Sequence, residues 1–238
     1  MIKKINIIFP LFVMALLIAS CDKDEKIYSC NKDVNDWVTA NKSQIDTIAY
    51  RESLLNFELE YQKGIYRALK PKIRYLIWVD KINQVLKLNW ENDERKHIEE
   101  LLNSINEKWF SEKLLSDKEL ISQRKGVLKN WVSLGLKELG WSKALIHSIA
   151  IRLDVKKSDD NYLIETYISD YKKTSNLKEA GGGCKCSSGD DWCDLGGGND
   201  NGSCTEDLYD CNHSSWGCGL LWLSECDGLC ELGVPDDN

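Results

Sequence analysis

"NLKEAGGGCKCSSGDDWCDLGGGNDNGSC", from Asn176 to Cys204, is the stretch in which the chain changes character. Before it lie about 150 residues that are rich in Lys, Glu, Leu, Ile and Trp and hold almost no cysteine. After the triple glycine at 181–183 the chain is rich in Cys, Gly and Asp, and eight of the ten cysteines follow. A composition shift of this kind predicts two regions that are stabilised in different ways.

The charge of the chain follows the same division. Residues 184–238 hold twelve Asp and Glu residues against one Lys, which gives this region a net charge of −11. Because the whole chain carries −7, everything before residue 184 carries +4. An acidic chain is not expected to bind nucleic acid, whose recognition depends on clustered basic residues.

Residues 31–175 are predicted to form a bundle of six to eight helices with short connections. Apolar residues recur at the i, i+3, i+4 and i+7 spacing of an amphipathic helix in three segments, 70–88, 92–110 and 116–139. Weaker patterns suggest further helices at 32–42, at 44–69 in two pieces, at 142–154 and at 159–173.

Both the starts and the buried faces of the three stronger helices can be predicted. We expect Pro71 in a first turn, Asn92 as an N-cap, and a capping box formed by Ser116 and Glu119. Tryptophans at helical spacing are expected in the core. The predicted apolar stripes are Tyr75, Trp78, Val79, Ile82 and Val85; Ile98, Leu101, Leu102, Ile105 and Trp109; and Leu120, Val127, Leu128, Trp131 and Leu134.

The C-terminal region, residues 184–238, is predicted to be a small, irregular module held by disulfides. It lacks helical periodicity and has too few large apolar residues for a core without covalent links. Zinc sites favour paired C-x2-C spacing, whereas these cysteines are spread singly, so four disulfides are the prediction. Their connectivity stays open among 105 pairings. The cysteines are Cys184, Cys186, Cys193, Cys204, Cys211, Cys218, Cys226 and Cys230.

No metal, cofactor or enzymatic site is predicted. The acidic stretch at 190–203 does not match the D-x-D-x-D-G-x5-E calcium loop. His97 and His147 lie outside any HExxH or other catalytic pattern, so both are expected to be surface or packing residues. The pair Cys184 and Cys186 lacks the C-x-x-C spacing of redox catalysts.

The N-terminus indicates export. Residues 1–20 have two lysines and then an apolar run, which is the pattern of a secretory signal, and the sequence up to Cys21 resembles the lipobox of bacterial lipoproteins. Cys21 is therefore predicted to carry lipid, although an ordinary signal peptide with Cys21 as a bystander is the alternative. Residues 21–30 resemble the charged tether of surface lipoproteins of Bacteroidota, or are a solvated linker.

This pattern places the protein outside the cytoplasm, anchored by lipid at the outer membrane or cell surface, where disulfides persist. With Cys21 acylated, Cys30 is left as an odd thiol, for which burial and pairing with another chain both stay open. The predicted organisation is a signal at 1–20, a tether at 21–30, the helical bundle at 31–175, a Gly-rich linker at 176–183 and the acidic module at 184–238.

The C-terminal module resembles fulvocin C, a small bacteriocin with eight cysteines, and the whole chain resembles the bacteriocin fulvocin C-related family. The resemblance rests on Cys184-Lys-Cys186, on the gap to Cys193 with Trp192 before it, and on the block "WGCGLLWLSEC" at 216–226. It implies a role in antagonism between bacteria. The last cysteine spacing and the acidity of residues 184–238 differ from the peptide, and an acidic segment is repelled by anionic membranes.

Two functions follow as hypotheses. In the first, the helical region is a lipid-anchored carrier and the module is an effector against a bacterial target cell, with Gly182 and Gly183 as a candidate processing site or only a hinge. In the second, the protein is a surface lipoprotein whose module binds a protein or a glycan without killing. Trp192, Trp216 and Trp222 are the candidate binding residues if they are exposed, and core residues if they are not.

Overall fold

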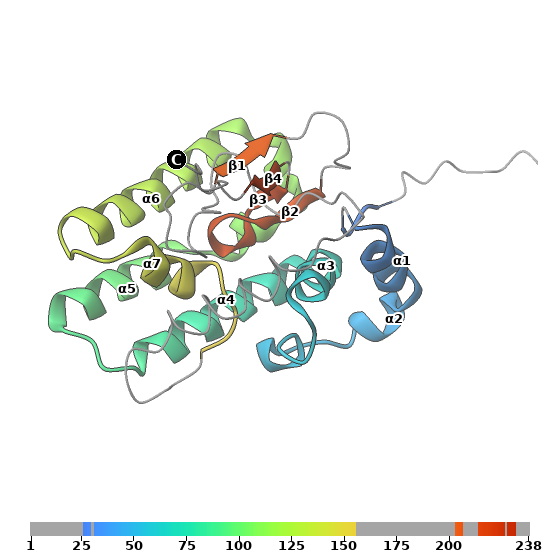
Figure 1. Cartoon of the computed structure of the whole chain (residues 1–238), viewed down its shortest axis with the longest axis horizontal. Helices are drawn as coiled ribbons and strands as arrows, with labels where there is room; N and C mark the ends of the chain where they lie inside the picture. The colour runs from blue at the N-terminus through green and yellow to red at the C-terminus, as the bar shows by residue number, and fades with distance from the viewer. Residues whose placement is uncertain (1–25, 30, 156–202, 207–213, 227, 232–238) are drawn as a thin grey trace, which may run out of the picture.

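The structure is a computed structural model that describes residues 26–29, 31–155, 203–206, 214–226 and 228–231 of the 238 in the chain. The protein is mainly helical, as expected, with a small C-terminal strand region that contains a disulfide (Figure 1). Its α-helices within the described residues are α1 (Lys32–Ala40), α2 (Lys42–Ile45), α3 (Leu59–Ala68), α4 (Pro71–Leu86), α5 (Asn92–Ser104), α6 (Lys118–Lys137) and α7 (Lys143–Ala150). The helix predicted at 159–173 lies outside the described residues.

Helix α4 lies at the centre of the bundle. It packs against α5 and α7 and against two short 3-10 helices, η2 (Arg51–Ser53) and η3 (Glu107–Phe110). On one side of it α1 packs against α3, and on the other α5 packs against α6 (Figure 1). A further 3-10 helix, η4 (Glu112–Ser116), leads into α6. The shared core therefore lies around α4.

Two predicted helix starts are each wrong by one residue. Helix α5 is capped by Glu91 rather than by Asn92, because Glu91 and Glu94 form a reciprocal capping box. Helix α6 is capped by the carboxylate of Asp117, and Ser116 belongs to the 3-10 turn before it. In both cases a carboxylate takes the position at which negative charge meets the positive end of the helix dipole.

The predicted apolar stripes agree with the core except at one end of α6. Trp78, Ile82 and Val85 are fully buried on α4, as the helical spacing predicts. On α6, Leu128 and Trp131 are buried, but Leu134 is 38% exposed. The helical repeat instead brings Gly135 to the buried face, where it lies against Trp141.

The described part of the C-terminal region contains four short strands that the sequence did not predict. Strand β1 (Ser203–Glu206) pairs with β4 (Gly228–Glu231), and β2 (Ser214–Cys218) pairs with β3 (Ser224–Cys226), both antiparallel. Between β2 and β3 a 3-10 turn, η6 (Leu220–Trp222), contacts α7, while β2 contacts α3. This hairpin lies over the middle of the bundle (Figure 1).

The burial of this hairpin decides the role of two tryptophans. Trp216 and Trp222 are 3% and 0% exposed and belong to the same hydrophobic core as the helices. They are therefore core residues, and the hypothesis that they form an exposed binding surface is wrong. Packing against the bundle removes their apolar rings from water more completely than the small module can do alone.

The disulfide Cys218–Cys226, one of those expected, lies within the described residues. Cys204 and Cys230 lie on β1 and β4 and face each other in the strand register. The other residues singled out from the sequence lie outside the described residues: Cys21, Cys30, Trp192, Gly182, Gly183, Cys184, Cys186, Cys193 and Cys211.

Two glycines at helical positions give opposite predictions. A Cβ at Gly126, on the exposed side of α6, has nothing within 4 Å, so Gly126→Ala should stabilise the fold by about 0.5–1 kcal/mol. A Cβ at Gly64 on α3 would lie 2.9 Å from Cγ1 of Val34, a stiff side chain on α1. Gly64→Ala should therefore destabilise it, by up to about 2 kcal/mol. Urea unfolding followed by circular dichroism measures both, and equal shifts of the same sign would contradict this α1–α3 packing.

Candidate functional site: the docked loop

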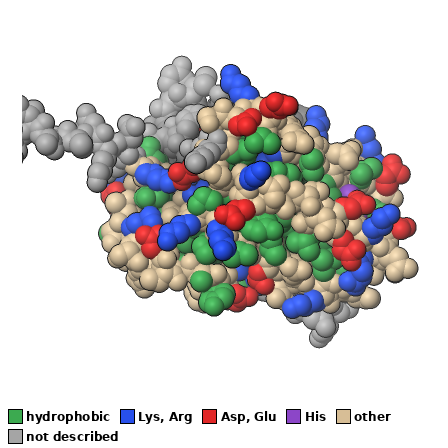
Figure 2. Space-filling model, turned by 180° about the vertical axis from the view of Figure 1, so that it is seen from behind, with side chains coloured by type: hydrophobic (Ala, Val, Ile, Leu, Met, Phe, Trp, Pro, Cys, Tyr) green, Lys and Arg blue, Asp and Glu red, His purple; other side chains and the backbone are tan. Residues whose placement is uncertain are grey.

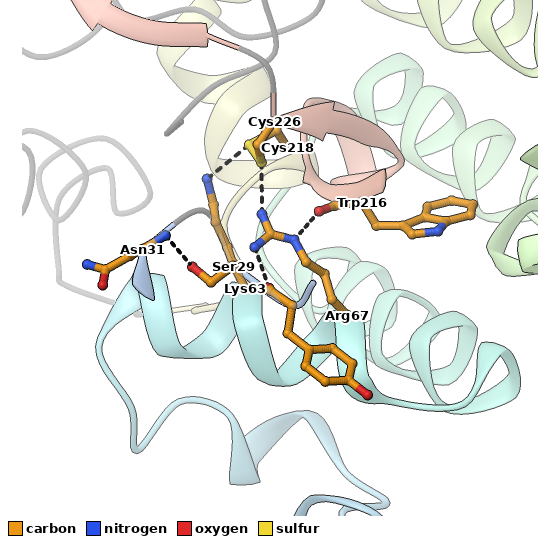
Figure 3. The surroundings of a disulfide bond; sticks show 8 residues. Ser29, Asn31, Lys63, Arg67, Trp216, Cys218 and Cys226 are labelled. Carbon is orange, nitrogen blue, oxygen red and sulfur yellow. Dashed lines mark hydrogen bonds between the residues drawn. A yellow bond between two sulfur atoms is a disulfide. The ribbon is translucent and has the colours of Figure 1, made fainter. Parts of the chain in front are cut away.

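The candidate site is the loop at 216–226, called the docked loop here, which Cys218–Cys226 closes (Figure 3). Glycines stand on both sides of Cys218 with positive φ, 108° at Gly217 and 68° at Gly219. A Cβ at Gly217 would lie 2.5 Å from Nε of Arg67. The block Gly217-Cys218-Gly219 is thus required by the local backbone and by the approach of a guanidinium group.

The tip of the docked loop has a strained backbone. Leu221 and Trp222 have φ values of 55° and 53°, in the left-handed region that bulky residues rarely adopt. Such a conformation costs on the order of 1–3 kcal/mol per residue and persists only where the surroundings impose it. Both side chains are fully buried. Burying an indole ring contributes about 5 kcal/mol, so at Trp222 packing outweighs strain.

Trp222 lies between two aromatic side chains of the bundle. Its ring meets Tyr66 of α3 edge-on at 5.1 Å between centroids and Trp78 of α4 at 5.9 Å. The Tyr66 hydroxyl accepts a hydrogen bond from Nε1 of Trp78 at 3.2 Å and donates one to the carbonyl of Leu221 at 3.4 Å. Burial raises the pKa of Tyr66, which keeps this hydroxyl protonated as a donor.

Buried arginines hold the backbone of the docked loop. Arg67 donates from Nε to the carbonyl of Trp216, and its Nη2 lies 2.9 Å from Sγ of Cys226. Arg124 of α6 donates from Nη2 to the carbonyl of Leu223 at 3.0 Å. The loop therefore receives charged donors from two separate helices, and hydrogen bonds to charged groups are the stronger kind.

The ring of Trp216 contacts two buried guanidinium groups, those of Arg74 on α4 and Arg124 on α6. The guanidinium carbons of Arg74 and Arg124 are each 5.5 Å from its centroid, within the range of a cation–π contact. Arg74 also donates to the carbonyls of Leu69 and Arg67, at 3.0 and 2.9 Å. The same arginines thus connect the helices to one another and to the loop.

The sequence contains a signal for two of these arginines. Arg74 stands four residues before Trp78, and Arg124 four residues before Leu128. Each arginine therefore lies on the apolar stripe of its own helix, where a long cation is uncommon unless it has a buried partner. Arg67 follows Tyr66 directly in α3 and has no comparable signal.

The two histidines are packing residues. His97 stacks on Trp131 with 5.1 Å between ring centroids, and its Nε2 lies 2.9 Å from the Trp131 carbonyl. His147 on α7 is 8% exposed, and burial keeps its pKa well below the usual value. Packing was one of the two roles expected for these residues.

A second buried polar cluster holds the segment after α7. Arg51 donates from Nη1 to the carbonyl of Leu153, and Lys81 donates from Nζ to the carbonyl of Asp154, both at 2.7 Å. Lys81 is fully buried, and this burial, with the nearby charges of Arg51 and Arg152, lowers its pKa from 10.5 to about 7 although Asp154 opposes the shift. These cations fix the course of residues 151–155 across α4.

Outside these clusters the described surface is mixed. The face in Figure 2 intersperses basic, acidic and hydrophobic side chains. In the part of the chain that the structure describes, four large hydrophobic residues are well exposed, and they come from four different segments: Ile27, Tyr50, Leu76 and Leu134. Among the described residues, no helix is long and apolar enough to span a membrane, and no group of three or more metal-ligating side chains is found.

Comparisons of the chain with protein-family models, with curated proteins and with solved structures found no match.

Removing the ring of Trp222 tests whether the docked loop belongs to the helical core. Trp222→Ala should lower the free energy of unfolding by about 3–5 kcal/mol, because it leaves a cavity between Tyr66 and Trp78. Urea unfolding followed by helical circular dichroism measures the change, with the exposed Leu134→Ala as the control at about 0.5 kcal/mol or less. A similar small effect for both variants would contradict the packing.

Lys81 predicts a pH dependence of stability. Its pKa is about 7 in the folded state against 10.5 ordinarily, so the unfolded chain binds the proton more tightly. Below pH 7 Lys81 is protonated in both states, so the folded state bears the full cost of burying its charge. From about pH 7 to 10 the folded state has lost this proton while the unfolded state keeps it, so the free energy of unfolding should rise. Lys81→Met should flatten this rise, whereas Lys87→Met, at the exposed end of α4, should keep it. An unchanged slope in Lys81→Met would contradict the assignment.

Proposed function

We propose that the protein is a lipid-anchored, extracytoplasmic, bacteriocin-related protein in which the helical bundle carries a fulvocin C-like module and keeps its apolar loop buried. The observation that carries this proposal is the place of the resemblance in the fold. The block that resembles the peptide, Gly217-Cys218-Gly219 with Trp222 and Cys226, is the docked loop itself. The part of the module that resembles an effector is thus the part that the bundle covers.

The contacts of the loop support a carrier role. An effector that acts on a target cell must present its side chains to that target, yet Leu221, Trp222 and Leu223 are at most 2% exposed. In this arrangement the intact protein is inactive, and activity requires the loop to leave the bundle. Cleavage in the linker at Gly182 or Gly183 cuts the covalent connection between the two regions, while the contacts of Arg67 and Trp222 delay separation.

The burial of the docked loop also weakens the alternative, a surface lipoprotein that binds a protein or glycan without killing. Two of its three candidate contact residues, Trp216 and Trp222, are in the core. The third, Trp192, lies outside the described residues. The surface-binding lipoprotein is therefore the hypothesis that would replace the carrier if no growth inhibition is found.

Growth inhibition tests the carrier proposal. The full chain is prepared with a specific protease site in place of Gly181–Gly183, and the oxidised C-terminal segment is separated after cleavage under mild denaturant. We expect the released segment to inhibit related bacteria and the intact chain to be inactive, because the loop is buried in the intact chain. The helical fragment alone is the control. Inactivity of both the segment and the intact chain would rule out antagonism.

The lipid anchor is tested separately. Fractionation of producing cells should place the protein with the membranes, and mass spectrometry should find acyl chains on Cys21. Cys21→Ala should move the protein to the soluble extracytoplasmic fraction without changing its helical circular dichroism. An unmodified Cys21 in membrane-free protein would contradict the anchor and leave the carrier role to the growth assay.

A further inference from the structure

The register of strands β1 and β4 points to a second disulfide. In the β1–β4 ladder, Ser203 pairs with Glu231, Cys204 with Cys230 and Thr205 with Leu229. Two cysteines therefore stand directly opposite each other on adjacent antiparallel strands. Residues in this relation lie on the same face of the ladder.

The spacing of such a pair fits a disulfide without backbone movement. Directly opposite residues of an antiparallel pair have Cα atoms about 4.5–5.5 Å apart. Disulfides span about 4.4–6.8 Å between Cα atoms, and the Cys218–Cys226 bond of this protein spans 5.2 Å. Neither Cys218 nor Cys226 is available as a partner for Cys204 or Cys230, because these two cysteines are bonded to each other.

We propose that Cys204 and Cys230 form a disulfide that encloses the docked loop and its own Cys218–Cys226 bond. The bond forms when the two thiols give up two protons and two electrons to a disulfide of an extracytoplasmic oxidant, which is reduced to its dithiol. The inference rests on the proposed extracytoplasmic location. It deepens the carrier proposal, because two nested covalent rings hold the shape of the loop base whether or not the bundle covers the tip.

Peptide mapping of the oxidised full chain tests this pairing. Free thiols are alkylated under denaturing, non-reducing conditions, and the chain is digested with a protease that cleaves before Asp. Cys204 is then the single cysteine of the peptide 200–206, and Cys230 the single cysteine of the peptide 227–235. We expect one linked species with the summed mass of the two peptides less two hydrogens, which separates on reduction.

The outcomes distinguish this inference from the proposed function. The pairing is overturned if Cys204 or Cys230 is alkylated, or if either is linked to another peptide. In that case an intact Cys218–Cys226 bond would still support the proposed oxidising, extracytoplasmic location. If all cysteines of the module are alkylated in protein isolated from its native compartment, both the Cys204–Cys230 disulfide and the proposed extracytoplasmic location are contradicted.

Single substitutions provide a second measurement. Cys204→Ser should expose one additional thiol to maleimide in the denatured, unreduced protein, and so should Cys230→Ser, whereas the double variant should expose none beyond the parent. Cys218→Ser is the matched control, because it frees Cys226 and leaves the 200–206 to 227–235 link intact. An additional thiol in the double variant would overturn the pairing.

Discussion

The insertion of Trp222 between Tyr66 and Trp78 is the contact on which the rest of the fold depends. It brings a residue from the far C-terminal region into the core of helices formed by residues 32–150. The strained turn at Leu221 and Trp222 is tolerated because of this burial. The helical region and the acidic module are therefore stabilised in part by one another.

The buried arginines explain how a loop without a core of its own is held in place. Arg67 and Arg124 donate to main-chain carbonyls of the loop, so recognition depends on its backbone shape as well as on its side chains. A guanidinium group is suited to this role because its fixed fork of donors reaches several carbonyls at once. The Cys218–Cys226 bond keeps those carbonyls in position by closing the base of the loop.

The helices could be predicted from the sequence because the spacing of apolar residues marks their buried faces, as in the stripe of Trp78, Ile82 and Val85. The exact caps were less predictable, since Glu91 and Asp117 compete with adjacent polar residues for the same position. The docked loop could not be placed at all. Its position depends on Tyr66 and Arg67, about 150 positions earlier in the chain, and no local pattern encodes a contact over that separation.

The free energy of unfolding of a chain that ends at Gly183 tests the central claim most directly. If the docked loop completes the helical core, this truncated chain should lose several kcal/mol relative to the full oxidised chain, and should expose Trp78 to added quencher. If instead the truncated chain unfolds at the same urea concentration as the full chain, with Trp78 equally protected, the helical region is complete without the loop and the account is wrong.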